Sequence, residues 1–466
     1  MTTTKIRGMA GVALLLLCMA QFLDSIDVST IAVALPAIQA ELGIPATTLQ
    51  WAVSAYVLGY GGFLLLGGRF ADIFGHRRTF LAGLLVFAVA SIAGGFVDSG
   101  PTLIAARLAK GVSAAFTAPA ALALLLSVFG EGPSRGRALG IFSSTAAAGY
   151  TLGMVFGGVA TIFTWRATLV MGAPFAIITL LLAPFILPAD KPRKGPRQSF
   201  DWGGAITITP ALLLLVFGVT NAADEGWDAI TTWGSLLASA ALLVLFLVIE
   251  ARHPVPMVPL EIFKRTKLTH ANIVAGLFHG VYVGFQFVAT LYFQNVLGWS
   301  ALATGMVFVF CGVAVMFLAP RFAVMAQTRS TGLMIVGTGL MALGYVVWLF
   351  GLGHMDTMLL IVLSQVPIGL GYAISYPSVQ VAALDGIEAD ESGLASGLLF
   401  SAFQIFGGVI LAFAASVFAA APGFGWDTYV AGSAFITVLG IATLLIASAG
   451  PRSIRRAAAS VRQPAE

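Results

Sequence analysis

The chain has 466 residues, of which 59% are hydrophobic and 9% are charged, and its formal net charge is +4. Soluble proteins carry about 25% charged residues, so this composition excludes a soluble globular protein and predicts a chain that lies in a lipid bilayer. The small net charge gives no indication of nucleic-acid binding. Cys18 and Cys311 both lie within apolar stretches, so we expect no disulfide.

Apolar stretches of about 20 residues recur along nearly the whole chain, and each is long enough to cross the hydrocarbon core as a helix. The first stretch follows basic residues, as in a signal peptide, but it contains Asp24 and Asp27 and lacks a small-residue cleavage site. We therefore expect it to be retained as the first transmembrane helix. The sequence predicts an all-α integral membrane protein whose fourteen spans cover about residues 9–36, 48–67, 79–97, 101–128, 138–161, 166–188, 204–221, 230–250, 270–295, 301–320, 331–352, 357–382, 392–420 and 427–449.

The positions of the basic residues support this span count. If both termini are cytoplasmic, nearly all of the 24 lysine and arginine residues fall on the cytoplasmic side of the cell membrane. This bias is usual in multi-pass membrane proteins. Arg166 falls on the outer side of the membrane, and Arg107 and Lys110 lie within the fourth span. An error in the count would move every later loop to the other side and remove the bias.

The chain divides into two sets of six spans. We predict an N-terminal six-helix bundle over residues 1–190 and a linker with two extra transmembrane helices over 191–269. A C-terminal six-helix bundle over 270–449 and a cytoplasmic basic tail over 450–466 follow. Two joined bundles are typical of a transporter with a central cavity between its halves. Since the sequence contains no Walker-type phosphate-binding loop, we do not expect ATP to drive transport.

A charged, glycine-containing segment follows the second span, with the sequence Gly-Arg-Phe-Ala-Asp-Ile-Phe-Gly-His-Arg-Arg over residues 68–78. Its charges alone also fit an ordinary cytoplasmic turn. The order of the residues closely resembles the signature loop of the major facilitator superfamily, with His76 at a position that is usually basic. The resemblance implies that the Asp bonds a helix end and the basic residues, and so latches the two halves together on the cytoplasmic side. The latch residues would be Gly68, Asp72, Gly75, Arg77 and Arg78.

The fifth span carries a glycine repeat. Gly149, Gly153 and Gly157 recur every four residues, so one helix face is bare enough for close packing, and Gly158 follows the last of them. Ordinary helix packing alone would explain this spacing. The segment also resembles the antiporter motif of drug exporters, with Met154 in the place of a proline, so we expect the glycine face without a proline kink.

Two further segments narrow the resemblance. The fourth span contains Arg107, two residues and then Lys110-Gly111, and is similar to a family motif tied to proton transfer in which Gln stands in place of Lys110. The segment over 26–36 resembles the first-span motif of the fourteen-span drug:proton antiporters. The resemblance implies the major facilitator fold, with two six-helix bundles and two extra linker helices. It also implies a transporter that is driven by a proton gradient and needs no cofactor or metal.

Four charges lie within the predicted spans. Asp24 and Asp27 are three residues apart on the first span, and Arg107 and Lys110 are three apart on the fourth, at comparable depth. We expect the two acids to face the two bases. One interpretation is that two ion pairs hold the bundle together. The other is a proton switch, in which Asp27 is the principal proton carrier and Asp24 the second.

A substrate cavity is predicted from polar and aromatic residues that repeat at helical spacing. The ninth span carries a polar stripe, two other spans carry pairs of tyrosines, and a glutamine precedes Asp24 on the same face. Packing between helices is the alternative explanation. The predicted cavity residues are Gln21, Tyr56, Tyr60, His279, Tyr282, Gln286, Tyr372 and Tyr376.

These features predict a monomeric, proton-coupled efflux transporter for small amphipathic compounds such as antibiotics or drugs. Because two acids face two bases, we expect neutral or zwitterionic substrates to be preferred over dications. The alternatives are an exporter dedicated to one endogenous metabolite, a proton-coupled importer, or a membrane sensor that does not transport. An enzyme is not expected, because the sequence contains no metal cluster, nucleophile–base pair or nucleotide loop.

Overall fold

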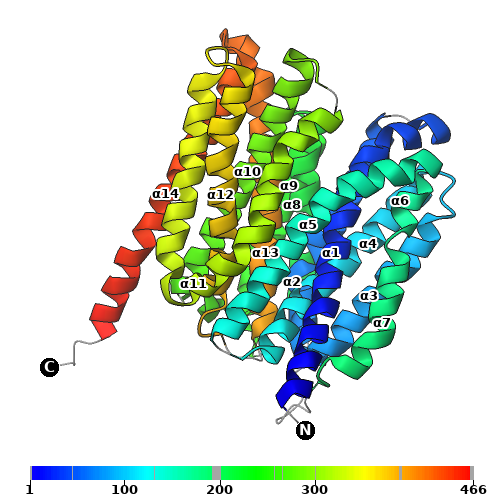
Figure 1. Ribbon diagram of the computed structural model, residues 1–466, viewed down its shortest axis with the longest axis vertical. Coiled ribbons are helices and arrows are strands. Elements are labelled where there is room, and N and C mark those ends of the chain that lie inside the picture. The colour runs from blue at the N-terminus through cyan, green and yellow to red at the C-terminus, as the bar shows by residue number, and fades with distance from the viewer. Residues whose placement is uncertain are drawn as a thin grey trace.

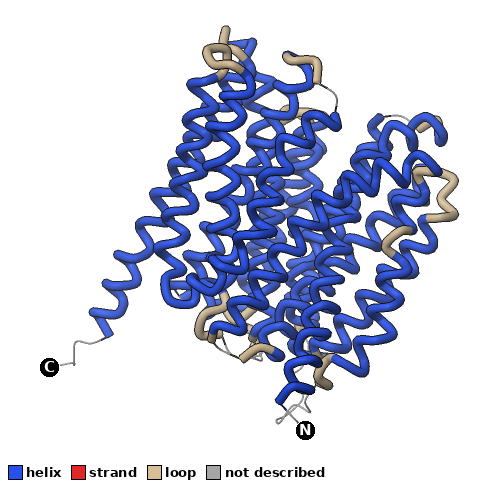
Figure 2. The backbone as a smooth tube through the Cα atoms, in the orientation of Figure 1, coloured by secondary structure: helices blue, strands red, loops and turns tan. Residues whose placement is uncertain are grey.

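The computed structural model describes residues 3–44, 46–130, 132–190, 201–254, 256, 258–264, 266–299, 301–387 and 391–461. These residues form long helices joined by short loops, and no strand occurs among them (Figures 1 and 2). The all-α prediction is confirmed in this part of the chain. Long helices are the expected outcome for such a sequence, because only a helix satisfies every backbone polar group of an isolated span within lipid.

The N-terminal half contains seven described helices. They are α1 (Thr3–Leu42), α2 (Ala46–Phe74), α3 (His76–Gly94), α4 (Gly100–Val128), α5 (Pro133–Phe163), α6 (Arg166–Val170) and α7 (Ala173–Ile186). The short α6 and the longer α7 together form one candidate span over Arg166–Ile186.

Two helices follow within the predicted linker, namely α8 (Trp202–Asp224) and α9 (Ile230–Arg252). The short η1 (Leu260–Lys264) also lies in the linker. The C-terminal half then contains α10 (Thr266–Leu291), η2 (Tyr292–Val296), α11 (Ala301–Gly351), α12 (Thr357–Ala383), α13 (Ser392–Ala420), η3 (Ala421–Phe424) and α14 (Thr428–Val461). The start of the linker, residues 191–200, lies outside the described residues.

Twelve helices in the described part of the chain are long and apolar enough to cross a membrane, and the bent helix α5 is a further candidate. The 51-residue α11 would be about 77 Å long if it were straight, more than twice the hydrocarbon thickness. Its backbone is not helical at Arg329, and the segment on either side of this break is long enough to cross. The chain is therefore a multi-pass membrane protein, and the count of fourteen spans stays a prediction.

The helices form two groups that lie side by side, with both chain termini toward the same end (Figure 1). In one group α1 packs against α5, and α4 lies between α2 and α3. In the other group α11 packs against α12, and α10 packs against α13 and α14. The extra helices α8 and α9 pack on each other, and α8 contacts α2 of one half and α13 of the other. The extra pair therefore lies beside the junction between the halves.

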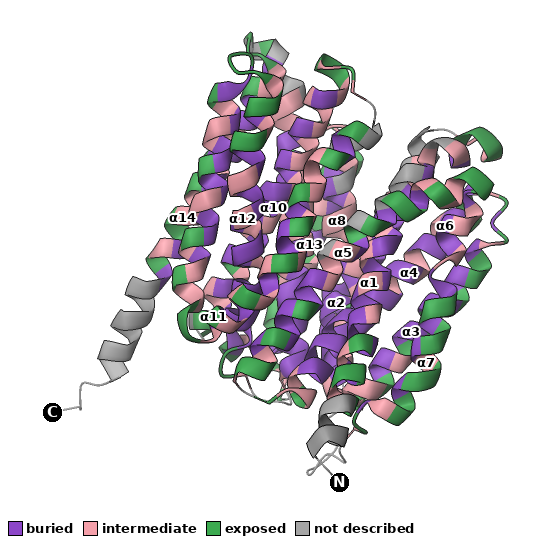
Figure 3. Ribbon diagram, viewed as in Figure 1, coloured by how far each residue is buried: buried purple, intermediate pink, exposed green. Residues whose placement is uncertain are grey.

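Figure 3 shows exposed residues along the outward faces of the bundle, and many of these residues are large hydrophobic ones, which is the reverse of the pattern in a soluble protein. Phe185, Leu181 and Ile178 of α7 are all exposed, for example, whereas the buried side chains lie where helices meet. Lipid covers such faces in a membrane protein.

The predicted tail over 450–466 is helical in its first part, because α14 continues to Val461. Residues 462–466 lie outside the described residues.

Candidate functional site

One carboxylate of α1 binds both bases of α4. Arg107 donates from Nη1 to Oδ2 of Asp27, and Lys110 donates from Nζ to Oδ1. Lys110 also donates to the carbonyl of Leu169 at 2.8 Å, and Arg107 donates from Nε to the carbonyl of Ala52 at 2.8 Å. The three charged side chains are buried. This cluster joins α1, α2, α4 and α6 within the N-terminal half.

Of the two acids that were expected to face the two bases, only Asp27 does so. Both bases bind Asp27, and Asp24 receives neither of them. Asp24 is buried, and its Oδ2 has no hydrogen-bond partner within the described residues. The reason is the direction in which each side chain points: Asp27 faces α4, whereas Asp24 faces a cavity between the halves. Equal depth in the membrane therefore does not decide which groups meet.

This central cavity has a volume of about 410 Å³. Its walls come from α1, α2 and α5 of the N-terminal half and from α10, α11, α12 and α13 of the C-terminal half. The structure places every residue of the predicted substrate cavity on these walls, namely Gln21, Tyr56, Tyr60, His279, Tyr282, Gln286, Tyr372 and Tyr376.

Polar groups on the C-terminal wall of the cavity bond one another. His279 Nδ1 lies 3.0 Å from the hydroxyl of Tyr372, and Gln286 Nε2 donates to the hydroxyl of Tyr282 at 3.4 Å. The ring of Tyr372 also stacks on that of Tyr376, with centroids 5.7 Å apart. This wall is therefore held together by its own contacts.

The N-terminal wall differs, because three of its buried polar atoms have no partner within the described residues. They are Oε1 of Gln21, Oδ2 of Asp24 and the hydroxyl of Tyr56. A buried polar atom without a partner is costly unless water or a ligand reaches it. The unsatisfied polar groups therefore gather on the side of the cavity that carries the free carboxylate.

Several cavity residues on α5, α11 and α13 were not among the predicted ones. Most of them are apolar or isolated within apolar stretches, so no periodic polar pattern marked them, and only the docking of the two halves brings them to the cavity. The missed polar and aromatic residues are Ser143, Tyr150, Phe308, Cys311, Phe400, Phe403 and Gln404.

The halves touch closely at one end of this cavity. Ser143 Oγ of α5 donates to Gln380 Oε1 of α12 at 2.7 Å. Three residues earlier, Gly140 lies against Pro320 of α11, so closely that a Cβ on Gly140 would be 2.2 Å from the proline Cα. Only glycine permits this close approach of α5 and α11.

Asp72 of the predicted latch joins the two halves at the same end of the molecule. Its carboxylate accepts hydrogen bonds from the backbone N–H groups of Gly393 at 2.9 Å and Leu394 at 2.8 Å. These residues begin α13, so the carboxylate lies where the helix dipole favours a negative charge. His76 Nε2 lies 2.9 Å from the same carboxylate. Gly68 completes the contact, because a Cβ there would be 2.5 Å from the carbonyl of Gly393.

Arg77 of the predicted latch has a different partner from the one expected. It donates from Nη1 to the carbonyls of Pro184 at 3.0 Å and Leu187 at 3.2 Å, at the end of α7. The expected bond to Asp72 is therefore replaced by a bond to a neighbouring helix end within the same half. A cation suits this position because the carbonyl end of a helix is negative.

Asp190 is a latch-region residue that no sequence pattern marks. Its carboxylate accepts from the backbone N–H groups of Arg77 at 2.9 Å and Arg78 at 3.1 Å, at the start of α3. Gly75 makes this possible: its φ is +105°, and a Cβ would lie 2.3 Å from the Asp190 carboxyl carbon. Nothing in the local sequence connects these residues, which are far apart in the chain.

The glycine repeat of α5 packs against α1. Gly149, Gly153 and Gly157 all face the α1 segment 22–30, and a Cβ on any of them would lie within 3.0 Å of a backbone atom there. Gly158 was expected to share this face, but a Cβ there would meet nothing within 4 Å, because it lies one residue round the helix. Helix α5 also bends by 40° between Tyr150 and Val155, within the glycine repeat and without the proline of the motif.

The model of the Major Facilitator Superfamily matches residues 17–412 of the chain. The chain belongs to this superfamily. It is 36% identical over 405 residues to the cephamycin export protein CmcT of Amycolatopsis lactamdurans, covering 86% of this chain and 83% of that protein. It is 33% identical to the puromycin resistance protein pur8 of Streptomyces alboniger, over 84% and 79%. It is 30% identical to the lincomycin resistance protein of Streptomyces lincolnensis, over 90% and 86%.

Solved structures show the same fold. The human organic anion transporter MFSD10 superposes with a TM-score of 0.70 at 16% identity, covering 94% of this chain and 99% of that one. The proton:xylose symporter XylE superposes with a TM-score of 0.66 at 14% identity. The predicted major facilitator fold is therefore confirmed, and the family is one of transporters.

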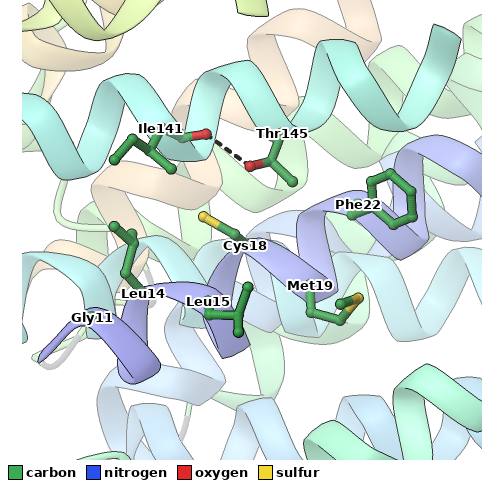
Figure 4. Close-up of a pocket in the computed structure, with 8 residues that line it drawn as sticks. All are labelled: Gly11, Leu14, Leu15, Cys18, Met19, Phe22, Ile141 and Thr145. Carbon is green, nitrogen blue, oxygen red and sulfur yellow. Dashed lines mark hydrogen bonds between the residues drawn. The ribbon is translucent and has the colours of Figure 1, made fainter. Parts of the chain in front are cut away.

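A second pocket lies between α1 and α5 of this transporter (Figure 4). Its volume is about 350 Å³, and apolar side chains form most of its lining. Leu15 and Ile141 on its wall are exposed, so it opens on the outer surface of the bundle. Cys18 and Thr145 line it, but it contains none of the predicted site residues. No group of three metal-ligating side chains lies together in the described part of the chain.

Proposed function

We propose that this chain exports small amphipathic compounds, antibiotics among them, in exchange for protons. The observation that carries the proposal is a buried Asp27–Arg107–Lys110 cluster directly behind a cavity formed by both halves. The relatives named for cephamycin export and for puromycin and lincomycin resistance support the substrate class. The membrane would be the cell membrane, with both termini cytoplasmic, as the distribution of basic residues indicates.

The Asp27 cluster offers a route from protonation to movement. A proton on Asp27 would remove the charge that holds Arg107 and Lys110, and would leave two buried cations uncompensated. An uncompensated buried charge costs several kcal/mol, roughly 3–5 when one partner of a pair is removed. The helices that carry these groups would therefore favour a different arrangement. Because α1 carries both Asp27 and Asp24, the cavity wall would move with it.

The described contacts correspond to one state of an alternating-access cycle. Asp72 and Gly140 touch the C-terminal half at the latch end of the molecule. At the opposite end the helix tips of the two halves spread apart (Figure 1). With the latch on the cytoplasmic side, these contacts would close this state to the cytoplasm. Substrate would be released from this state, and proton loading would follow.

An efflux assay with a chemically diverse panel tests this function. Inverted membrane vesicles that contain the protein should accumulate puromycin and lincomycin when the lumen is acidic, and a protonophore should abolish the accumulation. Vesicles with an Asp27→Asn protein provide the matched control. Accumulation that persists in the protonophore, or its absence for every compound of the panel, would contradict the proposal.

A second candidate is an exporter dedicated to a single compound that the cell itself makes, and the likeness to a cephamycin export protein favours it. The same panel separates the two. Export of several unrelated compounds supports the broad transporter, whereas export of one compound supports the dedicated one.

A further inference from the structure

The pocket between α1 and α5 begins where the tight contact of these helices ends. At Phe22 the two helices touch, because a Cβ on Gly149 would lie 2.9 Å from the carbonyl of Phe22. Toward the latch end the pocket of about 350 Å³ lies between them and extends along α1 as far as Gly11 (Figure 4). Leu15 and Ile141 on its walls are 60% and 42% exposed. The pocket is therefore closed at one end and open along the side that faces the bilayer.

The described lining of this pocket carries no group that would orient a polar ligand. The hydroxyl of Thr145 donates to the carbonyl of Ile141 at 2.8 Å, so it is satisfied within α5 (Figure 4). Cys18 is buried, and a buried thiol behaves as a small apolar group. The other lining residues are Gly11, Leu14, Leu15, Met19, Phe22 and Ile141. Sites for drug-sized molecules contain a few placed polar groups, so this lining favours a hydrocarbon chain.

The length of the pocket matches one leaflet of a bilayer. Its lining runs along α1 from Gly11 to Phe22, which is about 17 Å at a rise of 1.5 Å per residue. The hydrocarbon core of a bilayer is about 30 Å thick, so this length is roughly half of it. An acyl chain of a lipid in the leaflet on the latch side has this length and this chemistry.

A cation lies at the end of the pocket where the headgroup of such a lipid would be. Arg137 precedes Ile141 by four residues, one turn of α5 nearer the latch end, so both side chains lie on the same face of the helix. Arg137 is exposed, and it forms no hydrogen bond or ion pair within the described residues. A guanidinium group binds phosphate through paired hydrogen bonds. Arg137 is therefore placed to bind the phosphate of an anionic lipid.

We infer that an anionic phospholipid of the latch-side leaflet binds to this face of the protein: one acyl chain lies in the pocket between α1 and α5, and the phosphate pairs with Arg137. This inference goes beyond the proposed transport function and does not depend on it.

The bound lipid supports the helix that closes the latch end. Helix α5 has the pocket on one face and the C-terminal half on the other, where Gly140 lies against Pro320 and Ser144 Oγ donates to the carbonyl of Val315 at 3.3 Å. A ligand stabilises the arrangement that it binds best. Because the pocket is formed with α5 in this position, lipid binding favours the state in which α5 contacts α11.

The test compares an anionic lipid with a zwitterionic lipid of the same acyl chains. The purified full-length protein in detergent is titrated with phosphatidylglycerol and with phosphatidylcholine, and native mass spectrometry gives the Kd of the first bound lipid. The wild type should bind phosphatidylglycerol about fivefold more tightly, as expected for one basic side chain near a lipid headgroup. Arg137→Gln should remove this preference. Arg252→Gln is the control, because Arg252 is equally exposed but lies on α9, outside the pocket.

A second pair of variants tests the acyl-chain pocket. A Cβ on Gly11 would meet nothing within 4 Å, so Gly11→Leu fills the pocket without strain and should lose the tightly bound equivalent of both lipids. Gly158→Leu is equally open but lies outside the pocket, and it should bind both lipids as the wild type does. Photo-crosslinking from a diazirine at the middle of the acyl chain should label residues 11–22 and 141–145.

Three results would overturn the inference: a lipid preference that survives Arg137→Gln, an equal loss of preference in Arg252→Gln, or crosslinks that fall only outside the pocket. A dimer that forms in the wild type and is lost in Gly11→Leu would assign the pocket to a second copy of this chain, and would overturn it as well. Spin labels on each half at the latch end test the effect on α5. Phosphatidylglycerol should raise the population of short distances in the wild type but not in Gly11→Leu, and an equal rise in both would show that the lipid does not support α5.

Discussion

Two carboxylates three residues apart on α1 have different surroundings. Asp27 accepts from two cations, and Asp24 faces the cavity with an unpartnered oxygen. Their depth could be predicted from the sequence, because a helix rises by a fixed distance per residue. The division of the bases between them could not, because it depends on the rotation of α1 and α4 about their axes. That rotation is set by packing with α2, α5 and α6.

A residue-scale prediction concerns Glu41, at the end of α1 away from the latch. Glu41 accepts from Trp165 Nε1 at 2.8 Å and pairs with Arg166, which also donates from Nε to the carbonyl of Val97 at 2.8 Å. The hydrogen bond from Arg166 lowers the pKa of Glu41. A lowered pKa in the folded state stabilises the protein above the ordinary Glu value of about 4.3, and this contribution is lost as the pH falls through the lowered value.

We therefore expect Glu41→Gln to have a lower thermal unfolding temperature than the wild type at neutral pH, and the difference to disappear at acidic pH. Thermal unfolding in detergent across this pH range measures it. Equal loss of stability in both proteins on acidification would show that Glu41 does not produce the effect.

Helix α5 shows what spacing can and cannot predict at the scale of an element. The four-residue repeat correctly placed Gly149, Gly153 and Gly157 on one contact face. The resemblance to a motif added Gly158 to that face, and this was wrong because position 158 is turned toward open space. The bend of α5 was not predicted, because the sequence lacks the proline of the motif. Glycines that pack against another helix permit a bend as well.

The different surroundings of Gly153 and Gly158 give a matched pair of variants. A Cβ on Gly153 would lie 2.9 Å from the carbonyl of Ile26 and closer still to the Ser29 hydroxyl. Gly153→Ala should therefore destabilise the protein by about 1–3 kcal/mol through overpacking. Gly158→Ala should be neutral or stabilise it by up to about 1 kcal/mol through helix propensity. Thermal unfolding of the two variants side by side checks this, and equal effects would contradict the described α1–α5 contact.

At the scale of the whole molecule, the two-half architecture could be predicted, because hydropathy, charge bias and the polar linker all indicate it. The contacts between the halves could not be predicted from the sequence. Asp72 was expected to bond a helix end, but its partners Gly393 and Leu394 are more than 300 positions away and their segment carries no recognisable copy of the motif. The contact of α8 with both α2 and α13 also became visible only in the folded chain.

The Asp72 contact predicts a change in the balance between states. Asp72→Ala removes the cap from α13 and should shift the equilibrium toward a latch-open state by about fivefold, as expected for a cap worth about 1 kcal/mol. Spin labels placed on each half at the latch end would show a larger population of long distances. Asp385→Ala is the control, because Asp385 forms an exposed ion pair with Lys267 within one half. Equal effects of the two variants would contradict the latch assignment.

In the proposed mechanism, protonation of Asp27 in the charged cluster of the N-terminal half is coupled to substrate movement through the cavity. Purified protein in liposomes that contain a pH-sensitive dye tests it directly, with a transported compound added as a pulse in the absence of an imposed gradient. We expect substrate-driven proton movement in the wild type and none in Asp27→Asn, although Asp27→Asn should still bind the substrate. Proton movement of unchanged size in Asp27→Asn would show that Asp27 does not carry the coupled proton.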